Sequence, residues 1–214
     1  MSEEPQTGAR RKAARAAREA GRHLPAGLPP AFFLTDPART PDPAAIAAGL
    51  PRGWGVIYRH FGAPDQEAAA LELAAACRAR GLVLLIGADA RLAMQVGADG
   101  VHWPSRLAGA ARRWAGRFGM QTASAHGRAE LARLAGLPVE AALVSAVFPS
   151  ASPSAGAAMG PLRLRQLARL SPVPVYGLGG VNADNARRIS GFAGLAAIEG
   201  WRCFGGQPAS EAES

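Results

Sequence analysis

Lysine is almost absent from this 214-residue chain, because Lys12 is the only one and it lies near the N-terminus. Schiff-base chemistry and the attachment of pyridoxal phosphate both require a lysine amine beside the substrate. A lysine in an N-terminal extension does not lie on a strand that could carry such a site. The sequence therefore excludes both kinds of enzyme.

Cysteine is scarce as well, with only Cys77 and Cys203. Two cysteines do not make a disulfide framework, so we predict free thiols in a reducing compartment. The four histidines are scattered, and the sequence contains no HxH, HExxH or CxxC spacing. We therefore predict no zinc site.

Long apolar runs are missing too. No run reaches the roughly 18 residues that a membrane-spanning helix needs, and the first residues lack the charged, then apolar, then small-residue order of a secretory signal. We therefore expect no membrane association and a cytoplasmic location.

Positive charge is abundant, with a formal net charge of +8, of which residues 1–25 carry +3. Arg11, Arg15, Arg18 and Arg22 share one helical face, and the opposite face offers alanines that bury little apolar area. We therefore expect residues 1–25 to form a flexible, solvated extension. The rest of the chain has no basic stripe interleaved with aromatics, so we expect no specific nucleic-acid binding.

The body of the chain alternates short apolar runs with helical patterns. Such alternation is typical of parallel strands joined by helices. We predict an α/β fold, a single-domain (β/α)8 TIM barrel spanning residues 26–214, with an open doubly wound sheet as the alternative. The eight predicted strands are residues 31–34, 55–58, 82–86, 100–103, 121–124, 142–148, 173–178 and 194–198.

Helix boundaries are marked by local signals. Asp42 followed by Pro43 is typical of an N-cap and first helical residue, and Asp65 predicts a second helix start. Gly81 predicts the end of that second helix.

The most informative segment is VPVYGLGGV, residues 173–181. An apolar strand ends there in Gly179 and Gly180, which leave backbone N–H groups bare. Loops after the seventh and eighth strands of a barrel often hold a phosphate. The alternative is a tight turn that needs glycine for its backbone angles.

Several motifs together resemble the thiamine phosphate synthase and TenI superfamily over about residues 30–200. This resemblance implies a TIM barrel that binds the phosphorylated thiazole of thiamine. In the synthase it also implies joining to the pyrimidine with loss of Mg-pyrophosphate. The matching segments are FLTD (33–36), IYRHF (57–61), IGADARLA (86–93), GADGVHWPS (97–105), SAH (124–126), VFPSAS (147–152), GLGGV (177–181) and residues 194–198.

The residues that hold pyrophosphate in the synthase pattern are mostly replaced. A glutamine and a lysine become Ile57 and Phe61, and only Arg59 remains. The loop that should read TxTK keeps the hydroxyls of Ser150 and Ser152 but has Pro153 in place of the cation.

The two carboxylates that hold Mg²⁺ in the synthase are replaced as well. Ala88 and Leu107 stand at their positions, and Asp89 comes one residue late. A hard cation needs several oxygen ligands, so we predict no metal site. The serine that would cap the phosphate is Glu199, a carboxylate that repels a phosphate unless a cation such as Arg202 or Arg59 neutralises it.

The TenI branch resembles this chain more closely, through Pro104 and Ser105 and through its incomplete metal set. The resemblance implies metal-free thiazole tautomerisation by a histidine that matches His126. A histidine near a neutral pKa suits the removal and return of a proton. His102, at the end of a buried strand, is interpreted as structural.

Three functions are therefore open: a TenI-type acid–base enzyme, which we favour, a divergent thiamine phosphate synthase, and a non-catalytic binder. We predict no cofactor, with Mg²⁺ only if the synthase interpretation holds. The expected ligand is a phosphorylated thiazole or thiamine-related molecule, and self-association into a homo-oligomer is left open. The predicted site comprises catalytic His126 and the substrate-binding residues Arg59, Ser124, Ser150, Ser152, Gly179, Gly180 and Glu199.

Overall fold

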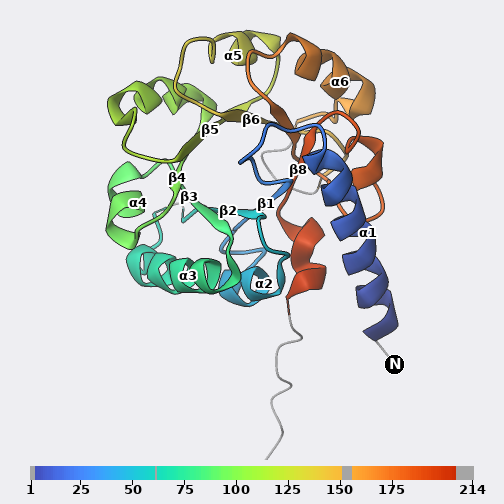
Figure 1. The fold of residues 1–214 in the computed structure, drawn as a ribbon, viewed down its shortest axis with the longest axis horizontal. Coiled ribbons are helices and arrows are strands. Elements are labelled where there is room, and N and C mark those ends of the chain that lie inside the picture. Colours follow the sequence, from blue (N-terminus) through green and yellow to red (C-terminus); the bar gives the residue numbers. More distant parts are fainter. Residues whose placement is uncertain (1–2, 61, 151–155, 206–214) are drawn as a thin grey trace, which may run out of the picture.

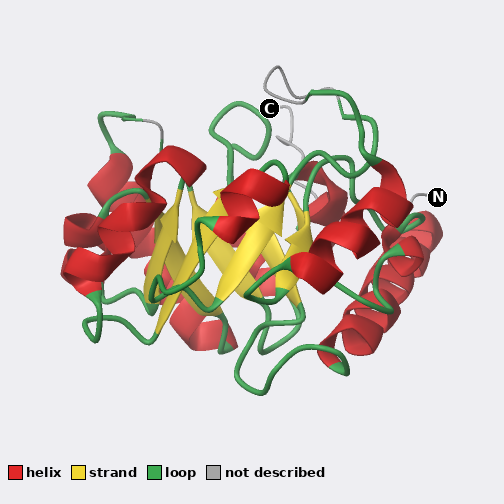
Figure 2. Cartoon of the chain, turned by 90° about the horizontal axis from the view of Figure 1, so that it is seen from above, coloured by secondary structure: helices red, strands yellow, loops and turns green. Residues whose placement is uncertain are grey.

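Eight parallel strands close into a barrel in sequence order, so the predicted (β/α)8 architecture is confirmed. The computed structural model describes residues 3–60, 62–150 and 156–205. Figure 1 views the ring of strands with the helices around it, and Figure 2 shows the strands enclosed between them. The strands are β1 (Ala31–Leu34), β2 (Gly55–Tyr58), β3 (Val83–Gly87), β4 (Gly100–Trp103), β5 (Met120–Ala125), β6 (Ala141–Val144), β7 (Val175–Gly177) and β8 (Gly194–Ala197).

Short helices connect the strands on the outside of the barrel (Figure 1). The α-helices are α1 (Glu3–Gly21), α2 (Pro43–Gly49), α3 (Gln66–Arg80), α4 (Ala90–Val96), α5 (Arg128–Ala132) and α6 (Gly160–Leu170). Two connections are the 3-10 helices η1 (Ser105–Trp114) and η2 (Ala186–Arg188), and a further 3-10 helix, η3 (Glu199–Phe204), follows the last strand. Within the described residues no helix is both long and apolar enough to cross a bilayer.

The barrel interior is filled by side chains. The rings of Phe32 and Tyr176 meet edge to face with centroids 5.0 Å apart. Both need glycine on the neighbouring strand, because a Cβ on Gly55 would lie 2.2 Å from the Phe32 ring and one on Gly194 would lie 2.3 Å from the Tyr176 ring. This packing closes the centre of the barrel and leaves the carboxyl ends of the strands to carry a site.

The predicted helix boundaries are confirmed. Asp42 is the N-cap of α2, where its side chain accepts a hydrogen bond from the backbone N–H of Ala45, and Pro43 begins that helix. Asp65 is the N-cap of α3 without a side-chain hydrogen bond, and Gly81 ends α3 with φ 66°. Glycine suits that left-handed position because it has no Cβ.

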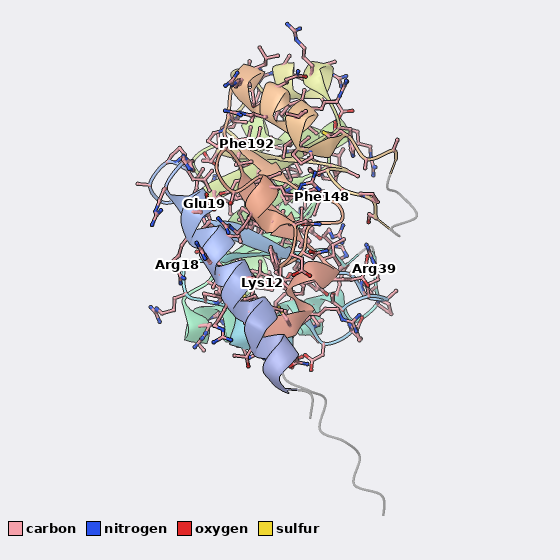
Figure 3. All side chains as sticks on the ribbon, turned by 90° about the vertical axis from the view of Figure 1, so that its right-hand side faces the viewer. Lys12, Arg18, Glu19, Arg39, Phe148 and Phe192 are labelled. Atoms are coloured by element: carbon pink, nitrogen blue, oxygen red, sulfur yellow. The ribbon has the colours of Figure 1, made fainter. Side chains whose placement is uncertain are left out.

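The flexible extension predicted for residues 1–25 is not found in the described part of that range. Residues 3–21 form α1, which packs against η3, β8 and η2 on the outside of the barrel (Figures 1 and 3). Ala13, Ala16, Ala17 and Ala20 are buried within the main hydrophobic core. Alanine side chains let the helix backbone approach closely, so this face buries the surface of neighbouring elements although each side chain is small.

Polar contacts hold α1 against η3 and against the residues that follow η2. The Arg10 guanidinium donates to the carbonyls of Cys203 and, at 3.2 Å, Gly205. A second contact involves Glu19, which Figure 3 labels on α1. Its Oε2 accepts a hydrogen bond from Ser190 Oγ at 2.7 Å. The N-terminal helix is therefore part of the barrel domain.

Candidate functional site

A cavity of about 470 Å³ lies at the carboxyl ends of the strands. Its wall is formed by loops that follow β1, β2, β5, β6, β7 and β8, so the topology brings together residues far apart in sequence. The predicted residues that line it are Arg59, Ser124, His126, Ser150, Gly179, Gly180 and Glu199. Ser152, and also Phe61 and Pro153 of the replaced clamp, lie outside the described residues. The catalytic and binding roles of these residues remain predictions.

Gly179 and Gly180 form one wall of the cavity, both with positive φ (91° and 65°). A Cβ on Gly180 would lie 2.3 Å from the carbonyl oxygen of Pro149, so the close approach of the two loops requires glycine here. Within the described part of the chain, the backbone N–H groups of both glycines donate no hydrogen bond. They remain available to an anion, as the predicted cradle requires.

Neighbouring residues hold the glycine loop in place. The backbone N–H groups of Val147 and Phe148 donate to the carbonyls of Leu178 and Gly179, each at 2.9 Å. Asn185 Nδ2 donates to the carbonyl of Gly180 at 2.8 Å. The carbonyls of the glycine loop therefore accept hydrogen bonds from the loop after β6 and from the residue before η2. These hydrogen bonds fix the orientation of the glycine loop.

His126 follows β5 and pairs with Glu130 of α5. Glu130 Oε2 lies 3.0 Å from His126 Nδ1 and also accepts the backbone N–H of His126 at 2.9 Å. Burial alone would raise the pKa of Glu130, but hydrogen bonds from Ser105 and His126 and the attraction of His126 together lower it. An ionised carboxylate only accepts hydrogen bonds, so Nδ1 carries a proton and Nε2 of the neutral ring is the basic nitrogen.

Arg39, which the sequence analysis missed, lines the cavity beside Arg59. Arg39 Nη2 lies 2.6 Å from Asp36 Oδ2, and Arg59 Nη2 lies 3.6 Å from the same oxygen. Burial raises the pKa of Asp36, but the hydrogen bonds and charge of Arg39, with the charge of Arg59, give a net lowering. Burial lowers the pKa of Arg59 to about 10, against the attraction of Asp36, so its guanidinium stays charged at neutral pH.

The carboxylate of Glu199 has cations on both sides. Arg39 Nη1 and Arg202 Nη1 each lie 3.9 Å from one of its two oxygens. The sequence analysis named Arg202 or Arg59 as the neutralising cation; Arg202 is confirmed, and Arg39 of the β1 loop is the second cation. Paired in this way, Glu199 repels an anion in the cavity less than a lone carboxylate would.

His102 is buried below the cavity, in agreement with its interpretation as a structural residue. Its Nδ1 lies 2.9 Å from Thr122 Oγ1 and its Nε2 lies 2.8 Å from Ser124 Oγ. Burial, with a smaller contribution from the charge of Arg59, lowers the pKa of His102 to about 3. The ring is therefore neutral at neutral pH.

The residues around the cavity do not fit a magnesium site. Glu199 is the only carboxylate among its described lining residues. Asp89 instead caps α4, accepting the backbone N–H of Leu92 at 2.9 Å, and Leu107 lies on η1. Magnesium in proteins prefers octahedral oxygen ligands that include carboxylates, and the described residues contain no cluster of three or more His, Cys, Asp or Glu side chains that could hold a metal.

Solved structures share the fold. Thiamine phosphate pyrophosphorylase from Pyrococcus furiosus superposes with a TM-score of 0.68 at 22% identity, covering 80% of this chain and 86% of that chain. A 4-hydroxy-2-oxoglutarate aldolase/2-deydro-3-deoxyphosphogluconate aldolase from TTHB1 superposes with a TM-score of 0.60 at 17% identity, covering 82% of this chain and 88% of that one.

Sequence relatives are named as thiamine enzymes. The thiamine-phosphate synthase of Thioalkalivibrio sulfidiphilus is 35% identical over 72% of this chain and 76% of its own length. That of Chromobacterium violaceum is 41% identical over 61% of this chain and 65% of its own length. The bifunctional ThiM/ThiE protein of Symbiobacterium thermophilum is 34% identical over 78% of this chain, which spans only 36% of that longer protein. The family model described as thiamine monophosphate synthase matches residues 33–200, and the chain therefore belongs to this TMP-TENI family.

Proposed function

We propose that this protein acts in thiamine biosynthesis or salvage, where it binds a thiazole phosphate and moves a proton on it by acid–base catalysis. The phosphate would bind the free N–H groups of Gly179 and Gly180, in the wall that a barrel commonly uses for phosphate. The thiazole ring would then extend across the cavity toward His126. Two observations support this arrangement: the chain belongs to the family, and Gly179, Gly180 and His126 line one cavity.

The single observation that carries the acid–base proposal is the 3.0 Å contact between His126 Nδ1 and Glu130 Oε2. It leaves Nε2 free to take a proton from one atom of the ligand. The same imidazolium can return that proton to another atom, so the ligand is isomerised and no other reactant is consumed. Glu130 stabilises the imidazolium formed between the two steps.

The replaced metal ligands support a reaction without Mg²⁺. Loss of pyrophosphate from a pyrimidine would develop negative charge that the synthase pattern neutralises with carboxylate-bound metal and a lysine. Ala88 and Leu107 provide neither metal ligand. An internal proton transfer develops less charge and requires neither.

A divergent synthase is the second candidate, and the names of the relatives favour it. Arg39 and Arg59 would have to provide all the positive charge for the leaving pyrophosphate. Removing one group that stabilises developing charge typically costs about 2.7–4 kcal/mol of transition-state stabilisation. We therefore expect coupling of pyrimidine and thiazole to be far slower than in a synthase with the full set.

The test is a calorimetric titration with thiazole phosphate and with thiamine phosphate, each in EDTA and in Mg²⁺. The proposal predicts binding of thiazole phosphate with the same affinity in both buffers. Binding that requires Mg²⁺, together with restored growth of a strain lacking the synthase, would establish the synthase instead. Binding in EDTA without any isomerisation would favour a non-catalytic binder.

A further inference from the structure

A chain of three side chains leads from the barrel interior to the cavity. Thr122 and His102 are buried, at 0% and 4% exposure, and Ser124 lines the cavity. The register places His102 of β4 directly beside Thr122 of β5. The two contacts, Thr122 Oγ1 to His102 Nδ1 and His102 Nε2 to Ser124 Oγ, measure 2.9 and 2.8 Å.

Each of the two contacts uses one proton, whereas the three side chains together carry three protons, so one proton is left over. A neutral imidazole has one N–H and one bare nitrogen, and each hydroxyl has one O–H. The ring stays neutral because burial and the Arg59 charge both lower the pKa of His102. Two arrangements are therefore open, which differ in whether Nδ1 or Nε2 carries the ring proton.

The buried hydroxyl of Thr122 decides between them. Within the described residues, the His102 ring is the only hydrogen-bond partner of Thr122 Oγ1. If Nδ1 carried the proton, Thr122 would accept it and its own O–H would have no acceptor inside the barrel. Leaving a buried donor without a partner is costly, enough to disfavour that form by about tenfold or more.

We infer that Thr122 and His102 form a relay that makes Ser124 a hydrogen-bond donor toward the cavity. Thr122 O–H donates to Nδ1, and Nε2–H donates to Ser124 Oγ. The Ser124 proton then has no partner among the described residues of the wall and points at the ligand. Thr122 and His102 are thus positioning residues, and proton transfer is left to His126.

The relay determines which atom of a ligand can sit beside Ser124. That atom must be a hydrogen-bond acceptor, such as an anionic oxygen or an unprotonated ring nitrogen. A ligand that presents an N–H there would face a second donor and be rejected. The identity of the ligand rests on the proposed function. The relay does not, because its hydrogen bonds are made without a ligand.

The first test reads the His102 tautomer directly by ¹⁵N NMR, without any ligand. Glutamine at His23, His60 and His126 leaves His102 as the only histidine, so its two ring nitrogens can be assigned. We expect a protonated Nε2 and a bare Nδ1 at neutral pH. A protonated Nδ1, or an imidazolium, would overturn the relay whatever the function of the cavity.

The second test removes the Thr122 hydroxyl. Thr122→Val keeps the side-chain shape but takes away the O–H donor, so the bare Nδ1 of His102 loses its hydrogen bond and its ¹⁵N resonance should shift. Thr122→Ser keeps a hydroxyl and should keep the resonance of the unmodified protein. An unchanged Nδ1 resonance in Thr122→Val would contradict the role given to Thr122.

Calorimetry with thiazole phosphate links the relay to binding. Ser124→Ala should weaken binding by about twofold to tenfold, the usual effect of losing one neutral hydrogen bond. Thr122→Val, which keeps the Ser124 hydroxyl, should weaken binding less than Ser124→Ala, and Thr122→Ser should bind as tightly as the unmodified protein. Unchanged affinity in Ser124→Ala would show that Ser124 does not donate to the ligand. An unmodified protein that does not bind thiazole phosphate would refute the proposed function alone.

Discussion

Arg39 and Glu199 lie side by side at the mouth of the cavity, with 3.9 Å between Nη1 and Oε2, because the strands that they follow, β1 and β8, pair with each other to close the barrel. Arg39 also contacts Asp36 at 2.6 Å, so this guanidinium is shared between two carboxylates. The negative charge at Glu199 is therefore only partly compensated beside the glycine loop.

Replacing Glu199 with serine should strengthen the binding of a phosphorylated ligand. Glu199 is half exposed, so its repulsion of a phosphate is screened, and we expect a gain of about 1 kcal/mol, or roughly fivefold in affinity. Arg39→Ala should have the opposite effect, because it leaves Glu199 with Arg202 alone. Titration with thiazole phosphate measures both, and equal affinities in all three proteins would show that the phosphate binds elsewhere.

Gly180→Ala should reduce both stability and phosphate binding. Its positive φ costs about 1–2 kcal/mol for a residue with a Cβ, and contact with the Pro149 carbonyl adds about 1–3 kcal/mol. Gly53→Ala is the matched control, because Gly53 has φ 76° but open space around its Cβ position. Urea unfolding and ligand titration should show a larger loss for Gly180→Ala in both measurements; equal losses in stability and unchanged binding would contradict the close approach of the two loops.

The packing of α1 predicts that Ala16→Asp destabilises the protein. Ala16 is fully buried, so an aspartate there loses its hydration, and we expect a cost of about 2–4 kcal/mol in the free energy of unfolding. Ala14 is only half-buried on the same helix, and Ala14→Asp should change stability by about 0.5 kcal/mol or less. Similar unfolding midpoints for the two variants would mean that α1 is not docked in solution.

Acid should destabilise the protein partly through His102. The folded pKa of about 3 lies below the value of about 6.5 expected in the unfolded chain. Above pH 6.5 both states are neutral, but as the pH falls toward 3 only the unfolded state takes up the proton. Stability is then lost by up to about 1.4 kcal/mol per pH unit.

The matched comparison for this acid effect is His102→Gln. Its free energy of unfolding, measured in urea between pH 7 and 5, should fall less steeply than that of the unmodified protein. Parallel pH profiles would show that the buried ring is not neutral in the folded state as described.

The strands were largely predictable because a buried parallel strand is a short apolar run. The predicted ranges for β1, β2 and β4 match the structure at both ends. Residues 145–148 were also predicted as strand, but β6 ends at Val144. That loop is apolar because it packs against the loop after β7, where Val147 and Phe148 donate to backbone carbonyls.

Two features depend on contacts between distant residues and were not predicted. Each alanine of α1 buries little apolar area by itself, so the sequence predicts weak packing. The small size of these side chains is what lets the helix pack on η3 and β8. Arg39 had a local signal, a cation shortly after a strand end, but its contact with Glu199 joins residues 160 positions apart. The convergence of the other described site residues was predictable, since barrel loops at one end share one mouth.

The measurement that tests the central claim most directly is the rate of thiazole phosphate tautomerisation in EDTA, followed by proton NMR in D₂O. We predict measurable turnover that falls by about 10²–10⁴-fold in His126→Ala, with binding retained within about tenfold, because acid–base groups act mainly in the transition state. Glu130→Gln should lower the rate less, since it keeps a hydrogen-bond partner for the ring. Full activity in His126→Ala, or turnover that appears only with Mg²⁺, would contradict metal-free acid–base catalysis by His126.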